Sequence, residues 1–159
     1  MSLHGDLRHQ ARHLATREPK RPRQASLRRA ISTAYYALFH LLTHEASRFM
    51  VSGTNREALR QCLGRAFAHQ TMKTVCKQFA SGTCPIKLQP ALPAQLIPSE
   101  LKEVAQAFVD LQQARHEADY DTARRFTRAE ANDLVDQCDQ AFTNWHIVRN
   151  TYSGEAFMV

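Results

Sequence analysis

Apolar residues recur every three to four positions along most of this chain, which is the spacing of amphipathic helices. The spacing predicts helices over residues 5–17, 24–49, 100–118 and 128–149. Another helical segment follows residue 54, but its apolar positions change face near residues 69–71, so we expect it to break there into two pieces. No strand pattern or internal repeat is present. The pattern therefore predicts an all-α, up-and-down bundle of about five helices.

Several sequence signals mark the expected ends of these helices. Thr54 with Glu57 and Thr127 with Glu130 have the spacing of capping boxes, and Ser99 is placed to cap the helix over residues 100–118. These three signals fix where the last three helical segments should begin.

Two segments carry no clear helical pattern. Residues 81–98 contain Gly82 and four prolines, so we expect a long loop that is either a partner-contacting loop or a wrapped connection. Residues 151–159 look like a loose tail, although the apolar residues 157–159 could dock onto the bundle.

Arg115 continues an apolar stripe on the helix over residues 100–118. The preceding stripe positions are Leu101, Val104, Phe108 and Leu111. Burying an unpaired charge costs several kcal/mol, so we expect Arg115 to be paired, at an interface or in a cleft. His116, Asp119 and Tyr120 follow closely and bring titratable groups to the same helix end.

A second segment, residues 27–42, places Arg29, Tyr36 and His40 on one helix face, opposite Ile31 and Leu38. A base could stack on Tyr36 while Arg29 contacts a phosphate. The alternative is ordinary packing of large amphipathic side chains.

Residues 27–42 and residues 115–120 together resemble the HEPN family (higher eukaryotes and prokaryotes nucleotide-binding), over roughly residues 5–150. The resemblance implies a single HEPN-like helical domain over residues 1–150, frequent dimerisation and often a metal-independent endoribonuclease. Members that cleave RNA carry an Arg-x(4–6)-His motif in which a polar residue follows the arginine. Arg115 and His116 fit this motif, whereas Tyr120, Asp121 and Thr122 occupy the places open to its histidine.

Three functions are compatible with these residues. The first is contact with RNA or nucleotide by a homodimer, through Arg29, Tyr36, His40, Arg115 and His116. The resemblance adds a nucleotidyltransferase-type antitoxin as a partner, in a toxin–antitoxin, stress or defence setting. The second is a metal-independent ribonuclease in which Arg115 stabilises the phosphorane and Tyr120, Asp119 or His116 replaces the missing histidine. The third is a structural interaction module, with Arg115 paired to Asp119 or to a carboxylate on a neighbouring helix.

The net charge of +6 is concentrated at the start of the chain. Residues 1–29 hold eight Lys and Arg residues and two acids, whereas the remaining residues are neutral overall. Such a patch contacts phosphates or an acidic partner, or it is simply a solvated, arginine-rich face.

Other function classes lack their sequence signals. No apolar run approaches the roughly 20 residues of a membrane span, and no secretory signal is evident. The four cysteines lack CxxC spacing, and three fall on apolar faces, which suggests reduced core residues of a cytoplasmic protein. His9 with His13 and His40 with His44 are spaced one turn apart, but no third ligand matches them, so we expect neither metal nor cofactor.

Overall fold

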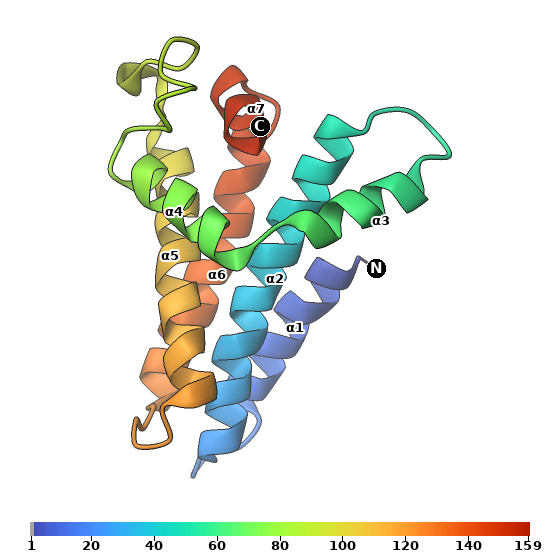
Figure 1. Cartoon of the computed structure of the whole chain (residues 1–159). Helices are drawn as coiled ribbons and strands as arrows, with labels where there is room; N and C mark the ends of the chain where they lie inside the picture. The colour runs from blue at the N-terminus through green and yellow to red at the C-terminus, as the bar shows by residue number, and fades with distance from the viewer. Residues whose placement is uncertain (1) are drawn as a thin grey trace.

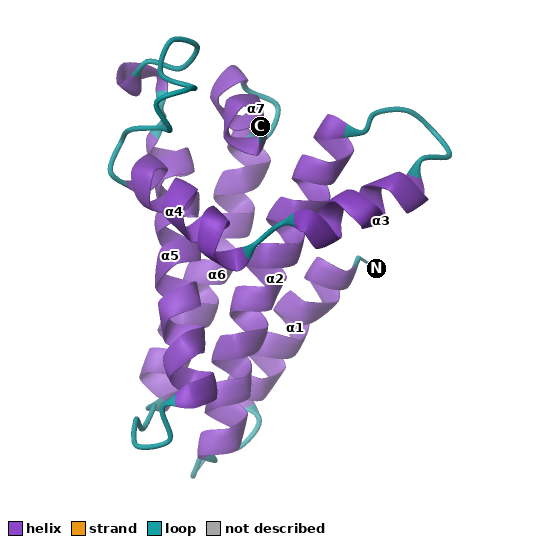
Figure 2. Cartoon of the chain, viewed as in Figure 1, coloured by secondary structure: helices purple, strands orange, loops and turns teal. Residues whose placement is uncertain are grey.

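The computed structural model describes residues 2–159 and contains seven α-helices and one short 3-10 helix. They are α1 (Leu3–Thr16), α2 (Gln24–Met50), α3 (Glu57–Ala66), α4 (His69–Ala80), η1 (Ala94–Leu96), α5 (Ser99–Tyr120), α6 (Arg128–Val148) and α7 (Tyr152–Met158). No strand occurs among residues 2–159, which confirms the all-α class (Figure 2). The expectation of about five helices is too low.

Helix α2 is the central element of the bundle and packs against α1, α5 and α6 (Figure 1). Its predicted inward residues Leu27, Ile31 and Leu38 are almost completely buried, as are Tyr35 on α2 and Trp145 on α6. Burial of large apolar side chains at about 25 cal/mol per Å² is the main force that holds such helices together. Residues 30–35 of α2 are all buried, so its three neighbours together enclose this part of the helix on every side.

Helices α3 and α4 run one after the other across the front of the bundle (Figure 1). The predicted break is confirmed, and it lies at Phe67 and Ala68, both in extended conformation. The expected capping box is wrong: α3 begins at Glu57 after Arg56, without a side-chain cap. Asn55 adopts a left-handed φ of 58°, and this turn sets the entry of the chain into α3.

The loop between α4 and α5 is a wrapped connection. Its residues Cys84, Leu92 and Ile97 are buried, and the Tyr152 hydroxyl donates to the Ala91 carbonyl at 2.7 Å. These contacts hold the loop against the upper end of the bundle, where it appears in teal in Figure 2.

The C-terminal residues form helix α7 rather than a loose tail. Thr151 caps the helix by accepting from the Gly154 amide, and Met158 is buried. Phe157 packs against Phe79 and Trp145, so the docking considered for residues 157–159 occurs through an ordered helix. A Cβ on Gly154 would lie 2.0 Å from the Val148 carbonyl oxygen, so this close approach requires glycine.

Helices α5 and α6 differ in how well the sequence predicts their start. The Thr127–Glu130 capping box of α6 is confirmed. The hydrogen bonds that Glu130 accepts from Thr127 and from Arg124 lower the pKa of Glu130 to about 2. Ser99 is not the cap of α5, since Pro98 occupies that position and no side chain caps the helix.

The basic N-terminal region does not form one uniform surface. Arg8 and Arg12 contact Asp139 on α6, and Arg28 donates to backbone carbonyls, whereas Arg21 and Arg29 are exposed.

Among the cysteines, Cys62 is exposed, contrary to its expected apolar face, and the other three are buried. None of the helices in residues 2–159 combines the length and apolar character that a bilayer crossing requires.

Candidate functional site

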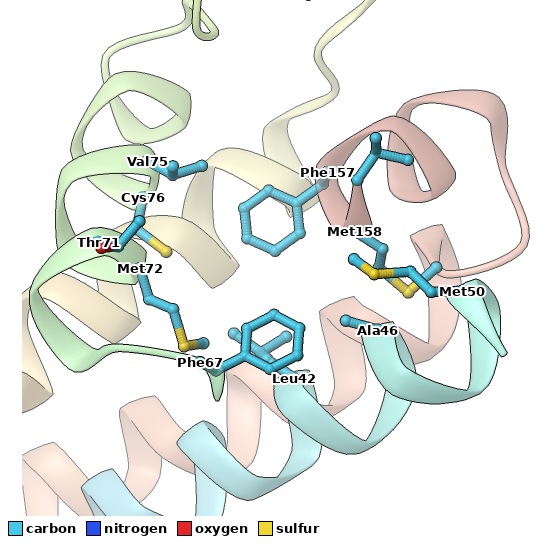
Figure 3. Close-up of a pocket in the computed structure, with 11 residues that line it drawn as sticks. Leu42, Ala46, Met50, Phe67, Thr71, Met72, Val75, Cys76, Phe157 and Met158 are labelled. Carbon is cyan, nitrogen blue, oxygen red and sulfur yellow. The ribbon is translucent and has the colours of Figure 1, made fainter. Parts of the chain in front are cut away.

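A cavity of about 180 Å³ lies between α2, α4 and α7 and is almost entirely apolar (Figure 3). The rings of Phe67 and Phe157 and the side chains of Met50 and Met72 face it from three sides. Its thiol, Cys76, has a pKa raised to about 12 by burial, so it stays protonated and is a poor nucleophile. This cavity is suited to apolar groups and offers no charged chemistry.

Arg115 forms the centre of a different site, between α5 and α2. Its side chain is only 13% exposed. The guanidinium carbon lies 5.2 Å from the ring centre of Tyr35 and 5.8 Å from that of Tyr36. A cation above aromatic faces is stabilised by the ring quadrupoles, which offsets part of the cost of its burial. The sequence expectation that Arg115 points into the molecule is therefore correct.

The hydrogen-bond donors of Arg115 are poorly satisfied. Its nearest carboxylate is Asp119, one turn along α5, with Nη1 and Oδ2 3.7 Å apart. The other Asp119 oxygen accepts from the Ser32 hydroxyl on α2. The buried Nε atom has no partner within the described chain, whereas the Tyr35 hydroxyl lies within reach of the guanidinium, whose charge and side-chain hydrogen bond oppose the rise in the tyrosine pKa. This arrangement leaves a planar set of donors for an acceptor from outside the chain.

His69, the first residue of α4, completes the site. Its Nδ1 atom lies 2.5 Å from the Tyr35 hydroxyl, and its ring stacks on Phe39 at a centroid distance of 4.1 Å. Gln112 on α5 donates to the His69 carbonyl at 3.2 Å and so fixes the start of α4. Desolvation, followed by the charges of Arg115 and His40, lowers the pKa of His69 below its ordinary value.

Sequence reasoning missed His69 because it lies far from Arg115 along the chain and outside the two segments that carried the pattern. The one available signal was the helix break beside it, which turns α4 across α5. Burial strongly raises the pKa of the Tyr35 hydroxyl, despite the opposing charge of Arg115, so this hydroxyl remains protonated. A protonated tyrosine hydroxyl can donate to Nδ1 or accept from it, so the direction of this hydrogen bond follows the tautomer of His69.

The predicted binding residues divide between the site and the outer surface. Tyr36 and His40 belong to the site, since their rings are 6.4 Å apart and Tyr36 also contacts Arg115 and His69. Arg29 is exposed and forms no hydrogen bond or ion pair within residues 2–159. The structure thus brings together two of the three predicted α2 residues.

His116 and Tyr120 lie on another face of α5. Both are exposed, Tyr120 to 67%, and their rings pack against each other at 5.1 Å. Tyr120 is five residues after Arg115, which corresponds to a rotation of about 140° around the helix. Of the three candidate catalytic residues, Arg115 and Asp119 are therefore adjacent, and Tyr120 is not.

Beyond Asp119 the surface forms a hollow of about 340 Å³ that includes Arg28, Arg124 and Arg125. Within residues 2–159 no group of three His, Cys, Asp or Glu side chains has the arrangement of a metal site.

Comparison with family models, with curated proteins and with solved structures gives no match to this chain. The chemistry around Arg115 is therefore the guide to function. At the junction of α2, α4 and α5 the guanidinium lies with two phenol rings, two imidazoles and one carboxylate, which belong to Tyr35, Tyr36, His40, His69 and Asp119.

Proposed function

We propose that the Arg115 site binds RNA or a nucleotide through a phosphate group and a base. The observation that carries the proposal is the guanidinium of Arg115, which is 13% exposed and whose buried Nε donor has no partner within the described chain. A buried donor without an acceptor costs about 1–3 kcal/mol, and more when it is charged. A phosphate presents several oxygens that match the guanidinium fork, so its binding would recover this cost.

The neighbouring side chains supply the remaining contacts that a nucleotide needs. With Tyr35 as donor to Nδ1, the neutral imidazole of His69 carries its proton on Nε2, which can then donate to a phosphate oxygen. The half-buried ring of Tyr36 provides a face for stacking a base. The sequence resemblance to the HEPN family agrees with this proposal.

Fluorescence anisotropy with a labelled oligoribonucleotide tests the proposal. We expect Arg115→Ala to weaken binding by about tenfold or more, because the main phosphate contact is lost. The matched control is Arg17→Ala, which removes an exposed arginine of the basic N-terminal region. Equal losses in the two variants would mean that binding is non-specific, and absence of binding by the wild type would overturn the proposal.

A second candidate function, RNA cleavage, is favoured by the presence of both Asp119 and His69 beside Arg115. In this reaction Asp119 accepts the proton of a ribose 2′-hydroxyl, and the 2′-oxygen forms a bond to phosphorus. The bond from phosphorus to the 5′-oxygen breaks, and His69, after taking up a proton so that Nδ1 donates to the Tyr35 oxygen, gives its Nε2 proton to the 5′-oxygen. The products are a 2′,3′-cyclic phosphate and a 5′-hydroxyl, and Arg115 stabilises the phosphorane between them.

Incubation of the protein with RNA in EDTA tests the cleavage reaction separately from binding. Cleavage that is lost in both Arg115→Ala and His69→Gln, with retention in His116→Gln, is the expected result for this candidate. Binding of RNA without any cleavage would leave the first proposal and eliminate the second.

A further inference from the structure

A second groove, which the Arg115 site does not use, lies between the start of α1, the second half of α2 and α3. Its volume is about 280 Å³. Three imidazoles and two guanidinium-bearing side chains line it: His4, His40, His44, Arg48 and Arg60. The rings of His4 and His44 are 5.3 Å apart. Figure 1 shows the N-terminus of α1 close to α3, on the same side of α2.

The groove contains a buried polar atom without a partner. Ser47 is 4% exposed, lines the groove, and its hydroxyl oxygen forms no hydrogen bond within the described chain. Buried hydroxyl groups are nearly always hydrogen-bonded, so an unpaired one indicates an unfilled acceptor or donor position. The hydroxyl is an independent sign that a polar ligand occupies this place.

The electrostatics of the groove favour an anion. Glu57 is the only acid among the described residues that line the groove; it is 63% exposed and lies 3.5 Å from Arg60. Arg60 also donates to the Val51 and Gly53 carbonyls, so Arg48 is the lining arginine that is offered to a ligand. Glu45, the neighbouring acid on α2, accepts from the Trp145 indole and pairs with Arg149 at 3.7 Å. Burial, followed by the neighbouring His44, lowers the pKa of His4 against the opposing charge of Glu45, and burial lowers the pKa of His40.

His40 connects the groove to the Arg115 site. Its ring is 6.4 Å from that of Tyr36, and the same side chain lines the groove. Helix α2 rises about 1.5 Å per residue, so Tyr36 and Arg48 are about 18 Å apart along its axis. An extended strand needs several nucleotides to cover this length, and it would also turn about 120° around α2 between Tyr36 and Arg48.

We propose that the groove around His44, Ser47 and Arg48 is a second phosphate subsite, so that the ligand of this protein is a single-stranded oligoribonucleotide rather than a mononucleotide. This inference rests on the function proposed for the Arg115 site. It assigns the first phosphate to Arg115 and a later phosphate of the same strand to the groove.

A length series separates the two subsites. Adenosine monophosphate and oligoriboadenylates of increasing length, up to a hexanucleotide, are titrated calorimetrically into the full chain. For the wild type we expect affinity to rise by about tenfold or more with length, because the second phosphate contact adds to the first. The double variant His44→Gln/Arg48→Gln should bind the monophosphate as the wild type does but lose the gain with length. Both side chains are exposed, so folding should be preserved.

The control variant is Arg65→Gln, which removes one exposed charge from α3 outside the groove. It should keep the length dependence, whereas Arg115→Ala should weaken the binding of every ligand in the series. Equal affinity for the monophosphate and the hexanucleotide, or a length dependence that survives in the double variant, would overturn the second subsite alone. Failure of the wild type to bind any of these ligands would overturn the function proposed for Arg115 and the subsite with it.

Discussion

Arg12 on α1 and Arg115 on α5 both contact carboxylates, but their surroundings differ. Arg12 is 40% exposed and donates to Asp136 and, at 2.8 Å, to Asp139. These two acids, Asp139 first, raise the pKa of Arg12. Arg115 is 13% exposed, and its only carboxylate partner is 3.7 Å away. The more deeply buried arginine thus has the weaker partner.

This difference distinguishes an arginine that joins two helices from the one that we propose binds a ligand. An arginine that contributes only to stability gains most when its donors are satisfied, as those of Arg12 are by α6. Arg115 is instead held by the rings of Tyr35 and Tyr36, and its buried Nε donor has no partner within the described chain. Arg128 also has two buried donors without a partner within the described chain, Nε and Nη2, so the proposed site rests on an unfilled Arg115 donor that lies beside two tyrosine rings and His69.

The largest effect on stability is expected at Arg28, whose donors are also satisfied. It donates to the carbonyls of Ala118, Asp121 and Arg124, just where α5 ends and the following turn begins. Arg28→Ala should lower the free energy of unfolding by about 2 kcal/mol, because several charged hydrogen bonds are lost. Urea denaturation measures this change.

Arg29→Ala is the matched control, because Arg29 is the adjacent residue and is exposed. It should change the free energy of unfolding by less than about 0.5 kcal/mol. A similar loss in both variants would show that satisfied donors are not what makes an arginine structural in this protein.

The next largest effect is expected from Arg115→Lys, which keeps the charge but removes the planar fork. RNA affinity should fall about tenfold, equivalent to about 1.4 kcal/mol, since an ammonium cannot engage two phosphate oxygens in the same geometry. Titration by anisotropy measures the loss. Full retention of affinity would mean that Arg115 acts as a point charge, and that the planar arrangement of its N–H donors has no role in binding.

A smaller effect, on the pH dependence of stability, is expected from His69, whose pKa is affected by the charge of Arg115. The folded state lowers the pKa of His69, and the unfolded value is about 6.5. The unfolded chain therefore binds more protons as the pH falls, which destabilises the fold. The contribution of neutral His69 to the free energy of unfolding is complete above pH about 6.5, and it is lost as the pH falls through the pKa of His69 in the folded state.

The His69→Gln variant should lose part of this pH dependence, measured as the free energy of unfolding between pH about 7.5 and 5. His13→Gln, which removes an exposed histidine of α1, should keep it. An identical pH dependence in the wild type and in His69→Gln would contradict the environment described for His69.

The smallest effect is expected from Tyr120→Phe and His116→Gln, which alter the outer face of α5. Both should leave RNA affinity within about twofold of the wild type, because neither side chain lies with Arg115. A large loss of binding or cleavage in either variant would restore the site that the linear sequence motif suggests.

The sequence predicts much of the fold because periodicity is a local property. The stripe of Leu27, Ile31 and Leu38 on α2 and the capping box at Thr127 both appear in the structure where the pattern places them. Helix α7 was missed because its order comes from tertiary contacts of Phe157 and from the close approach at Gly154, which no local pattern contains.

The candidate site was predicted in part for the same reason. Arg115 is out of place on an apolar stripe, and this local anomaly identified it. His69 reaches Arg115 only because the break after α3 turns the chain across α5, so its role depends on the fold. The dimer, the nucleotidyltransferase-type partner and the cytoplasmic location that the sequence suggested stay predictions.

The most direct test of the account is a paired measurement of RNA affinity and of the free energy of unfolding for Arg115→Ala and Arg12→Ala. We expect Arg115→Ala to lose affinity about tenfold or more with stability within about 1 kcal/mol of the wild type. Arg12→Ala should lose about 1 kcal/mol of stability, since its ion pairs are partly exposed, and keep its affinity. The opposite pattern, with Arg115 needed for folding and irrelevant to RNA, would contradict the central claim.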